Sequence, residues 1–476
     1  MDQLKVEQRV AVLGGGVARL SAAWKLAEQG IGVDLYEAAP ALGGMAASWE
    51  RNGYTWDFGP HRFYTKNQAI LGTVRDLVGD DLLTRYRKTR VYFLNRFYHY
   101  PLNAGNLLTN LPKSLAVASL FDFAGMKVRQ HFRPAEDDSF ESWVVNRFGR
   151  RLYDIYFGPY TAKVWGRDPS KLSASWAAQR VAVVDLWDVI LRTLKLRRGD
   201  NGFHHTEYKD EFWYPRRGIG QLSEAMATRA RDHGANLLTG ARIAAIEHDG
   251  RSVTGIRYRQ GDREFVRPCD AAVSTLPLPL FVQLLSPAPP DEVLAVARSL
   301  QYRAMIFLFL EIDKPSVTDD HWIYFPAPET IFNRISEMRN FSPDAAPPGK
   351  TSLTLEITCD IGDEIWTMPE EEIYRRSIAG LVDCGLIEER QVLGHFYRRL
   401  SHAYPTYDRD FEAKIGHLAY HLADFDNMVN AGRQALFRYV NTDHVMEMGF
   451  CAAQELVEGA LGSRVERVGS EQVWFG

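Results

Sequence analysis

Cysteine is scarce in this chain of 476 residues, which contains only Cys269, Cys359, Cys384 and Cys451. No two of them form a CxxC pair, and they lie far apart in the sequence. The sequence therefore predicts neither a disulfide framework nor a cysteine metal site, and we expect no metal. This cysteine usage is typical of a reducing compartment and favours a cytoplasmic location.

Long hydrophobic runs and a strong charge of one sign are also missing. The longest apolar candidate, residues 115–126, is interrupted by Asp122 and is too short to span a bilayer. Lys and Arg number 56 against 60 Asp and Glu, for a net charge of −4. This balance does not favour nucleic acid or anionic membranes as partners. The first ten residues lack a secretion-signal pattern, and the sequence leaves the oligomeric state open.

Glycine is plentiful by contrast, and residues 10–20 place it between a β-branched run and a segment with helical periodicity. The spacing G-x-G-x-x-G needs three glycines; Gly14 and Gly16 are present, whereas Arg19 occupies the third position. The first two glycines allow a tight turn and a close approach to a pyrophosphate, and the third lets the helix pack on the strand. The sequence predicts a nucleotide cofactor and breaks one position that holds it.

The residues that follow specify which nucleotide cofactor is expected. A predicted strand ends in Glu37, about twenty residues after the glycine turn, where a carboxylate accepts hydrogen bonds from a ribose 2′-OH. Gly43 and Gly44 form a second glycine turn that can approach the diphosphate, and residues 54–61 form a strand-like stretch that contains Gly59. This continuation is typical of FAD-binding proteins of the glutathione-reductase-like superfamily. An ordinary βαβ unit without a cofactor is the alternative.

Arg19 has two interpretations. A long charged side chain between helix and strand costs on the order of a few kcal/mol in packing unless it reaches solvent. Alternatively, the guanidinium swings out and pairs with a phosphate of the cofactor. We expect FAD to bind, with an affinity that Arg19 lowers, and we expect Arg19→Gly to strengthen flavin retention. A flavin-poor pseudoenzyme is the alternative raised by this residue.

The chain is long enough for more than one domain. Helical periodicity dominates residues 104–200, alternating apolar patterns dominate residues 300–410, and cofactor-type segments recur at both ends and in the middle. We predict an α/β fold in which a discontinuous Rossmann-like FAD-binding domain receives a helical insert and an antiparallel-sheet insert. The predicted divisions are 1–75, 210–288 and 428–476 for the FAD-binding domain, 76–209 for the mostly helical insert, and 289–427 for the antiparallel-sheet substrate domain.

Several segments resemble a known superfamily. The glycine fingerprint, WYPRRGIGQL, GARIAAI, VSTLPL and NTDHVMEMG resemble the FAD-dependent amine-oxidase and protoporphyrinogen-oxidase superfamily. The inserted segments, among them GPHRFYT, FGPYTAKVWG, FNRISEMRNFSP and YRRLSHAYPTYDRDFE, are similar to the eukaryotic-type branch of the UDP-galactopyranose mutase family. This resemblance implies reduced FAD, with NADPH or NADH as candidate reductants. It also implies pyranose/furanose isomerisation of a nucleotide sugar through attack of flavin N5 on the anomeric carbon.

The same resemblance implies substrate-binding residues. Arg180 and Arg334 stand at the positions of the family's two diphosphate-binding arginines, and forked guanidinium hydrogen bonds suit a diphosphate both bound and departing. Further implied substrate contacts are Tyr404, Tyr439, Trp165, Trp322, Tyr324 and Asn441. Salt bridges for the arginines and core packing for the aromatic residues are the alternatives.

Residues around the flavin are implied in the same way. His61 matches a histidine beside the isoalloxazine, where a tautomer-dependent hydrogen bond can respond to the redox state of the flavin, and it joins Arg334 and Arg180 as an expected catalytic residue. A buried structural histidine is the alternative. Arg433 matches a flavin-contacting arginine whose charge favours the reduced anionic flavin. The full set of expected cofactor-binding residues is Gly14, Gly16, Glu37, Gly43, Gly44, Gly59, His61, Ile243, Arg433, Thr442 and Asp443.

Departures from the family pattern leave the substrate open. Pro60 replaces a glycine of the family's GGH sequence, and Thr161 stands where the eukaryotic-type mutases carry asparagine. These changes concern the sugar and the nucleotide more than the class of reaction. The alternative function is that of an amine-oxidase-like FAD oxidoreductase, which removes hydride from a small organic substrate. The paired arginines favour the nucleotide sugar, because amine and porphyrinogen substrates carry no diphosphate.

Overall fold

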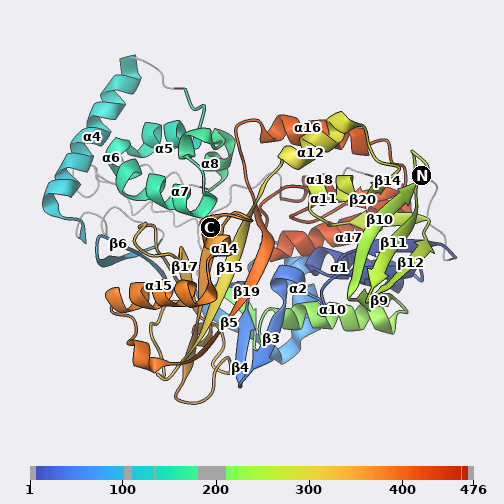
Figure 1. Cartoon of the computed structure of the whole chain (residues 1–476), viewed down its shortest axis with the longest axis horizontal. Coiled ribbons are helices and arrows are strands. Elements are labelled where there is room, and N and C mark those ends of the chain that lie inside the picture. The colour runs from blue at the N-terminus through green and yellow to red at the C-terminus, as the bar shows by residue number, and fades with distance from the viewer. Residues whose placement is uncertain (1–6, 101–109, 133–135, 181–210, 462–463, 470–476) are drawn as a thin grey trace.

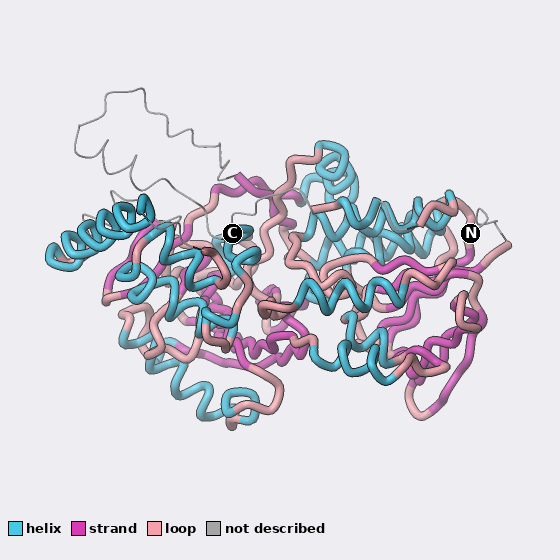
Figure 2. The backbone as a smooth tube through the Cα atoms, turned by 90° about the horizontal axis from the view of Figure 1, so that it is seen from above, coloured by secondary structure: helices cyan, strands magenta, loops and turns pink. Residues whose placement is uncertain are grey.

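The structure, a computed structural model, describes residues 7–100, 110–132, 136–180, 211–461 and 464–469, without the side chains of Gln179 and Arg180. Figure 1 shows the parallel nucleotide-type sheet and its helices on the right and a group of helices at the upper left. Seen from above, the molecule is elongated, and these two parts lie at opposite ends (Figure 2).

The first sheet consists of five parallel strands in the order β20-β13-β1-β2-β9. Their bounds are β20 Met428–Asn430, β13 Ala271–Ser274, β1 Arg9–Leu13, β2 Gly32–Glu37 and β9 Asn236–Thr239. Both faces of β1 are covered, and its last four residues are fully buried, as a parallel sheet requires. The strands come from widely separated parts of the chain, which confirms the predicted discontinuous nucleotide-binding fold.

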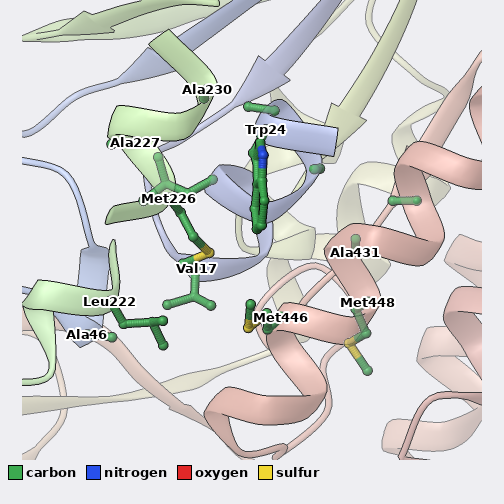
Figure 3. Packing of buried hydrophobic residues seen from close by; sticks show 14 of the residues in the cluster. Val17, Trp24, Ala46, Leu222, Met226, Ala227, Ala230, Ala431, Met446 and Met448 are labelled. Atoms are coloured by element: carbon green, nitrogen blue, oxygen red, sulfur yellow. The ribbon is translucent and has the colours of Figure 1, made fainter. Parts of the chain in front are cut away.

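Three helices cover one face of this sheet. They are α1 (Val17–Glu28), α10 (Gly220–Asp232) and α17 (Thr442–Glu458). Figure 3 shows α1 between the other two, with Trp24 near Met226 of α10 and with Met446 and Met448 on α17. Because α1 is packed on both sides, its N-terminal end is held at the carboxyl ends of β1 and β2, where a parallel sheet binds nucleotides.

A smaller sheet of four strands lies beside the first one. Its order is β12-β11-β10-β14, and the first three strands are antiparallel. The bounds are β10 Ala241–His248, β11 Val253–Gln260, β12 Arg263–Pro268 and β14 Leu285–Ser286. The remaining strands, outside the large sheet, form two short antiparallel pairs: β3 (Ser48–Arg51) with β4 (Tyr54–Asp57), and β5 (Leu82–Tyr86) with β8 (Glu211–Pro215).

The largest sheet has seven strands in the order β19-β15-β18-β17-β16-β6-β7, and all neighbours are antiparallel except β16 and β6. The bounds are β19 Val392–Pro405, β15 Tyr302–Ile312, β18 Thr351–Cys359, β17 Arg334–Glu337, β16 Trp322–Tyr324, β6 Thr89–Phe93 and β7 Arg96–His99. This sheet confirms the predicted antiparallel insert. The strands β6 and β7 come from the stretch predicted to be mostly helical. Leu94 and Asn95 join them with positive φ of 51° and 56°, as a two-residue hairpin requires.

Helices follow β7 in the described part of the first insert: α4 (Lys113–Phe132), α5 (Phe140–Phe148), α6 (Arg150–Leu152), α7 (Gly158–Trp165) and α8 (Ala174–Arg180). Ser139 begins α5 with a capping box, because its hydroxyl accepts from the Ser142 N–H and the Ser142 hydroxyl accepts from the Ser139 N–H. In the part of the chain that the structure describes, no helix combines the length and apolar character needed to cross a bilayer.

The other helices connect these layers. They are α2 (Gln68–Val78), α11 (Leu278–Gln283), α12 (Asp291–Ser299), α13 (Met338–Phe341), α14 (Glu364–Thr367), α15 (Glu370–Asp383), α16 (Phe411–Leu422) and α18 (Arg464–Arg467). Asn67 starts α2 by accepting from the N–H groups of Ala69 and Ile70. This start fixes the chain that leaves the segment containing His61.

Candidate functional site

A cavity of about 410 Å³ is lined by residues of both the parallel sheet and the seven-stranded sheet. It collects most of the site residues predicted from the sequence: Gly16, Glu37, Gly43, Gly44, His61, Trp322, Tyr324, Arg334, Tyr404, Arg433, Tyr439, Asn441 and Thr442. A larger cavity of about 550 Å³ shares Tyr439 and Val440 with it and is lined mainly by α16 and by the chain that follows α16 up to Val440. That cavity contains neither of the glycine turns, so the smaller one is the candidate site.

Five predicted residues lie outside this lining. They are Gly14, Gly59, Trp165, Ile243 and Asp443. Asp443 is buried, and its Oδ1 lies 2.8 Å from Nδ1 of His444. Trp165 packs against Tyr404, with ring centroids 5.9 Å apart, and so lies behind a residue of the cavity wall. Ile243 packs with the apolar residues between the sheets.

Arg180 is the last residue of α8, and its side chain lies outside the described part of the structure. Its predicted position opposite Arg334 therefore stays a prediction. Trp176 and Ala177 of the same helix are buried, and the Trp176 ring lies 4.6 Å from that of Trp165. The helix that carries Arg180 is thus attached to the aromatic residues behind Tyr404.

The two glycine turns lie directly against each other. Gly16 and Gly43 form a parallel bridge, and the Gly43 N–H donates to the Gly15 carbonyl at 2.7 Å. Gly43 and Gly44 have φ of 109° and 57°, values that residues with a side chain rarely adopt. A Cβ built on Gly16 would meet no atom within 4 Å, so the space before the N-terminus of α1 is open. An open helix N-terminus flanked by glycines fits a pyrophosphate.

The side chain of Arg19 fills space at the neighbouring strand ends. Its Nη2 donates to the Thr275 carbonyl at 2.6 Å, its Nε donates to the Thr275 hydroxyl, and its Nη1 lies 3.7 Å from a carboxylate oxygen of Glu37. A Cβ on Gly14 would overlap the guanidinium, which is only 12% exposed. Burial lowers the pKa of Arg19 to about 10, and Glu37 partly offsets this effect. The third fingerprint position is therefore filled by a cation rather than left empty.

The Glu37 carboxylate accepts hydrogen bonds from the backbone. The carboxylate accepts from the Gly15 N–H at 2.6 Å and from the Ala39 N–H at 2.7 Å. The residue sits at the end of β2, as the fingerprint predicts for a ribose-binding acid. The residues thus fit a dinucleotide at the paired glycine turns, whereas Arg19 opposes it beside Gly14 and Glu37.

At the other end of the cavity, Arg334 forms a forked ion pair with Glu356. Nε lies 2.7 Å and Nη2 2.6 Å from the two carboxylate oxygens. The two residues face each other across β17 and β18, and Glu356 is only 1% exposed. Although burial opposes the charge, Glu356 raises the pKa of Arg334 well above its ordinary value. Sequence reasoning missed Glu356; the alternating pattern of both strands was the signal that could have paired them.

Arg433 is held by aromatic rings instead of by an acid. Its Cζ lies 3.9 Å from the ring centroid of Tyr439 and 4.8 Å from that of Tyr404. The two rings are stacked, with centroids 5.3 Å apart and planes 13° apart. Within the described residues, the buried Nε and Nη2 of Arg433 have no hydrogen-bond partner. A cation stabilised only by π faces can still receive an anion.

His61 lies beside both of these cations. Burial lowers its pKa to about 4, and Arg334 and Arg433 add to the effect, so the imidazole is neutral near pH 7. Its buried Nδ1 finds no hydrogen-bond partner in the described chain. Gly59, with φ of 83°, brings the preceding turn so close to Glu356 that a Cβ there would overlap the carboxylate. The position of His61 thus depends on Gly59, because only a residue without a side chain leaves room for the Glu356 carboxylate that pairs with Arg334.

Aromatic and apolar side chains complete the wall. Trp322 and Tyr324 lie on β16, and the Tyr324 ring packs against that of Tyr160, with centroids 5.9 Å apart. Further lining comes from Phe58, Met305 and Phe307. Among the residues that the structure describes, no three His, Cys, Asp or Glu side chains are grouped to hold a metal ion. The cavity therefore combines ring-stacking surfaces with two guanidinium groups at one end.

Comparisons with known proteins agree with this fold. The family model described as flavin containing amine oxidoreductase matches residues 18–385. A crystal structure of reduced UDP-galactopyranose mutase is similar in fold, with a TM-score of 0.83 and 24% identity over 97% of this chain and 98% of that one.

Curated relatives are matched over shorter lengths. The mitochondrial protoporphyrinogen oxidase of Nicotiana tabacum is 29% identical over 186 residues, which is 36% of this chain and 35% of the relative. A probable UDP-galactopyranose mutase of Klebsiella pneumoniae is 24% identical over 227 residues, which is 46% of this chain and 53% of the relative. The chain thus spans between about a third and half of the length of these relatives.

Proposed function

Since the chain belongs to the flavin containing amine oxidoreductase family, we propose that it binds FAD in this cavity and isomerises the sugar ring of a nucleotide sugar. The observation that carries the proposal is the half-buried Arg433 guanidinium, which lies near His61 as Arg334 does and has two buried nitrogens without a partner in the described structure. A diphosphate supplies the charge and the several acceptor oxygens that two guanidinium groups require.

The two arginines have different tasks in this proposal. Glu356 engages Nε and Nη2 of Arg334, which fixes the guanidinium plane and leaves Nη1 outside the pair for a ligand oxygen. Arg433 contributes a charge that no described acid neutralises, so it binds an anionic leaving group more strongly as negative charge develops. Together they hold a nucleoside diphosphate in the ground state and favour its departure from the sugar.

Other residues orient the substrate and exclude water. Trp322 and Tyr324 offer faces against which a base or sugar ring can pack, and Phe58 and Phe307 make the opposite region apolar. His61 is neutral near pH 7, so its ring can donate one hydrogen bond and accept another. When bound, reduced flavin supplies the nucleophile that these side chains lack. The fold likeness to reduced UDP-galactopyranose mutase supports the nucleotide-sugar substrate.

The test is isomerisation by the FAD-loaded chain after anaerobic reduction with dithionite. UDP-galactopyranose is the first of a panel of nucleotide sugars, and NMR reads the ring form of the product. We expect furanose signals with the reduced protein and none with the oxidised protein. Arg433→Met is the test variant: its flavin content is measured first, and its conversion per bound flavin should be lost. Reduced, flavin-loaded protein that converts no member of the panel and binds no UDP would contradict the proposal.

An oxidoreductase is the second candidate, and it is supported by the family itself and by the similarity to protoporphyrinogen oxidase. Such an enzyme consumes oxygen with its substrate and needs no added reductant. An oxygen electrode therefore separates the two candidates. An oxidoreductase consumes oxygen in proportion to the substrate added, whereas a mutase consumes it only when oxygen reoxidises the reduced flavin. Bleaching of the bound flavin by NADPH or NADH in the same preparation identifies the reductant. For either candidate function, we propose a cytoplasmic location.

A further inference from the structure

The guanidinium of Arg19 lies across three adjacent strand ends. Gly14 follows β1, Glu37 ends β2, and Thr275 follows β13, and these strands are neighbours in the parallel sheet. Arg19 contacts all three positions, with two hydrogen bonds to Thr275 and a 3.7 Å approach to Glu37. The carboxyl ends of adjacent parallel strands are where this class of sheet receives the nucleotide half of a dinucleotide.

The nucleotide half of FAD and the Arg19 head group need the same partners. Glu37 is the acid placed for the ribose hydroxyls, and its Oε2 is already shared by the Gly15 N–H and Arg19. Gly14 provides a surface without a side chain for a ligand to approach, and the guanidinium lies directly against it. Arg19 also lines the cavity itself, together with Gly16, Gly43 and Gly44. It therefore occupies ligand space and does not merely pack between helix and sheet.

We propose that Arg19 is a built-in competitor for the nucleotide half of FAD, so that flavin binding requires its side chain to leave Glu37 and Thr275. This inference rests on the proposed flavin function. Its consequence is that the flavin is a dissociable ligand of this chain: it binds slowly, is released readily, and occupies the site only as far as its concentration allows. In a fingerprint with glycine at this position, no such side chain would have to leave.

The experiment measures FAD binding to flavin-free protein by quenching of FAD fluorescence, at equilibrium and in stopped flow. We expect Arg19→Gly to bind FAD at least about tenfold more tightly, which corresponds to about 1.4 kcal/mol, and to associate faster. ADP, which carries the nucleotide half alone, should gain a similar factor. Riboflavin, which lacks that half, should bind both proteins equally.

Lys25→Gly is the matched control. Lys25 lies on the same helix and pairs with Glu28 at its exposed surface, so this variant loses helix propensity as Arg19→Gly does but should not alter FAD binding. Circular dichroism and thermal unfolding without FAD verify that each variant is folded. Arg19→Ala provides the same measurement if the glycine variant fails to fold.

The remaining outcomes separate the inference from the function on which it rests. Equal FAD affinity in the wild type and Arg19→Gly overturns the inference and leaves the flavin function intact. Weaker binding by Arg19→Gly also overturns it, because Arg19 would then be a ligand of the phosphates. If neither protein binds FAD while riboflavin and ADP also fail to bind, both the inference and the flavin function are wrong.

Discussion

The two ends of the candidate cavity each contain a half-buried arginine, and the two differ in what surrounds the charge. We call the region of Gly14, Arg19, Glu37 and Thr275 the nucleotide end, and the region of His61, Arg334, Glu356, Tyr404, Arg433 and Tyr439 the reactive end. At the nucleotide end, Arg19 has two hydrogen bonds and a nearby carboxylate. At the reactive end, Arg433 lies on two aromatic rings, and its buried nitrogens have no partner among the described residues.

This difference teaches that a cation in a cavity is available to an anion only if the protein has not already satisfied it. Arg19 must lose contacts before it can bind a phosphate, whereas Arg433 only gains them. Arg334 is the intermediate case, because Glu356 takes one edge of its guanidinium. The three arginines should therefore respond differently to removal: Arg334 mainly in stability, Arg433 mainly in ligand affinity, and Arg19 in flavin binding.

The largest expected effect is that of Arg334→Met on stability. The substitution leaves the Glu356 carboxylate buried without its partner, and a change of this kind typically costs about 3–5 kcal/mol. Urea unfolding of the flavin-free protein measures the loss. The double variant Arg334→Met with Glu356→Leu should recover most of the stability, because an apolar pair can replace a buried ion pair at little cost. A single variant as stable as the wild type would show that the pair contributes nothing.

A somewhat smaller effect is expected from Arg433→Met, and it should appear in binding. Removal of a half-buried cation whose buried Nε and Nη2 have no hydrogen-bond partner in the described chain should leave the free energy of unfolding unchanged or higher. The affinity for UDP, measured by calorimetry, should fall by about tenfold to a hundredfold, the value of a hydrogen-bonded charge. A large loss of stability without a loss of UDP affinity would assign Arg433 to the same class as Arg334.

The pH dependence of stability gives a third measurement. Burial, Arg334 and Arg433 lower the pKa of His61 to about 4, below the ordinary value of 6.5 for an unfolded chain. Between these values the unfolded state binds the additional proton, so stability falls as the pH drops from about 6.5 to 4, by up to about 1.4 kcal/mol per pH unit.

His61→Asn should remove this contribution to the slope of stability against pH. NMR titration of the His61 imidazole then tests the cause. Arg433→Met should raise the His61 pKa, because one neighbouring charge is lost, whereas Arg19→Gly should leave it unchanged, because Arg19 is not among the charges that shift it. A His61 pKa that does not respond to Arg433→Met would mean that burial alone sets it.

The nucleotide-binding fold could be predicted from the sequence, and most of the predicted site residues line the cavity. The spacing of the glycine turns and Glu37 along the chain is typical of a nucleotide-binding unit. The resemblance supplied five further residues that all line one cavity: His61, Arg334, Tyr404, Arg433 and Tyr439. These predictions rest on segments whose order along the chain is itself informative.

What the sequence did not predict depends on partners distant along the chain. Glu356 gains its role only from the register of β17 and β18, which pairs it with Arg334. The direction of the Arg19 side chain depends on Thr275, which is 256 residues away. The strands β6 and β7 are short and belong to a sheet formed by residues more than two hundred positions later. Local patterns contain no record of such pairings.

The smallest effect should come from Tyr404→Phe, and it shows whether the reactive end depends on aromatic rings or on hydroxyl groups. The Tyr404 hydroxyl lies 3.5 Å from Nη2 of Arg334, too far for a strong hydrogen bond, whereas its ring stacks on Tyr439 and lies 4.8 Å from the Arg433 Cζ. We expect a change in unfolding free energy below about 0.5 kcal/mol and a loss of UDP affinity of only a few fold.

Tyr302→Phe is the control, because the Tyr302 hydroxyl donates to the Gln434 carbonyl at 2.7 Å and its loss should cost about 1 kcal/mol. If Tyr404→Phe weakens UDP binding as strongly as Arg433→Met, the hydroxyl itself binds the phosphate, and the difference between the two ends of the cavity does not lie in the arginines alone.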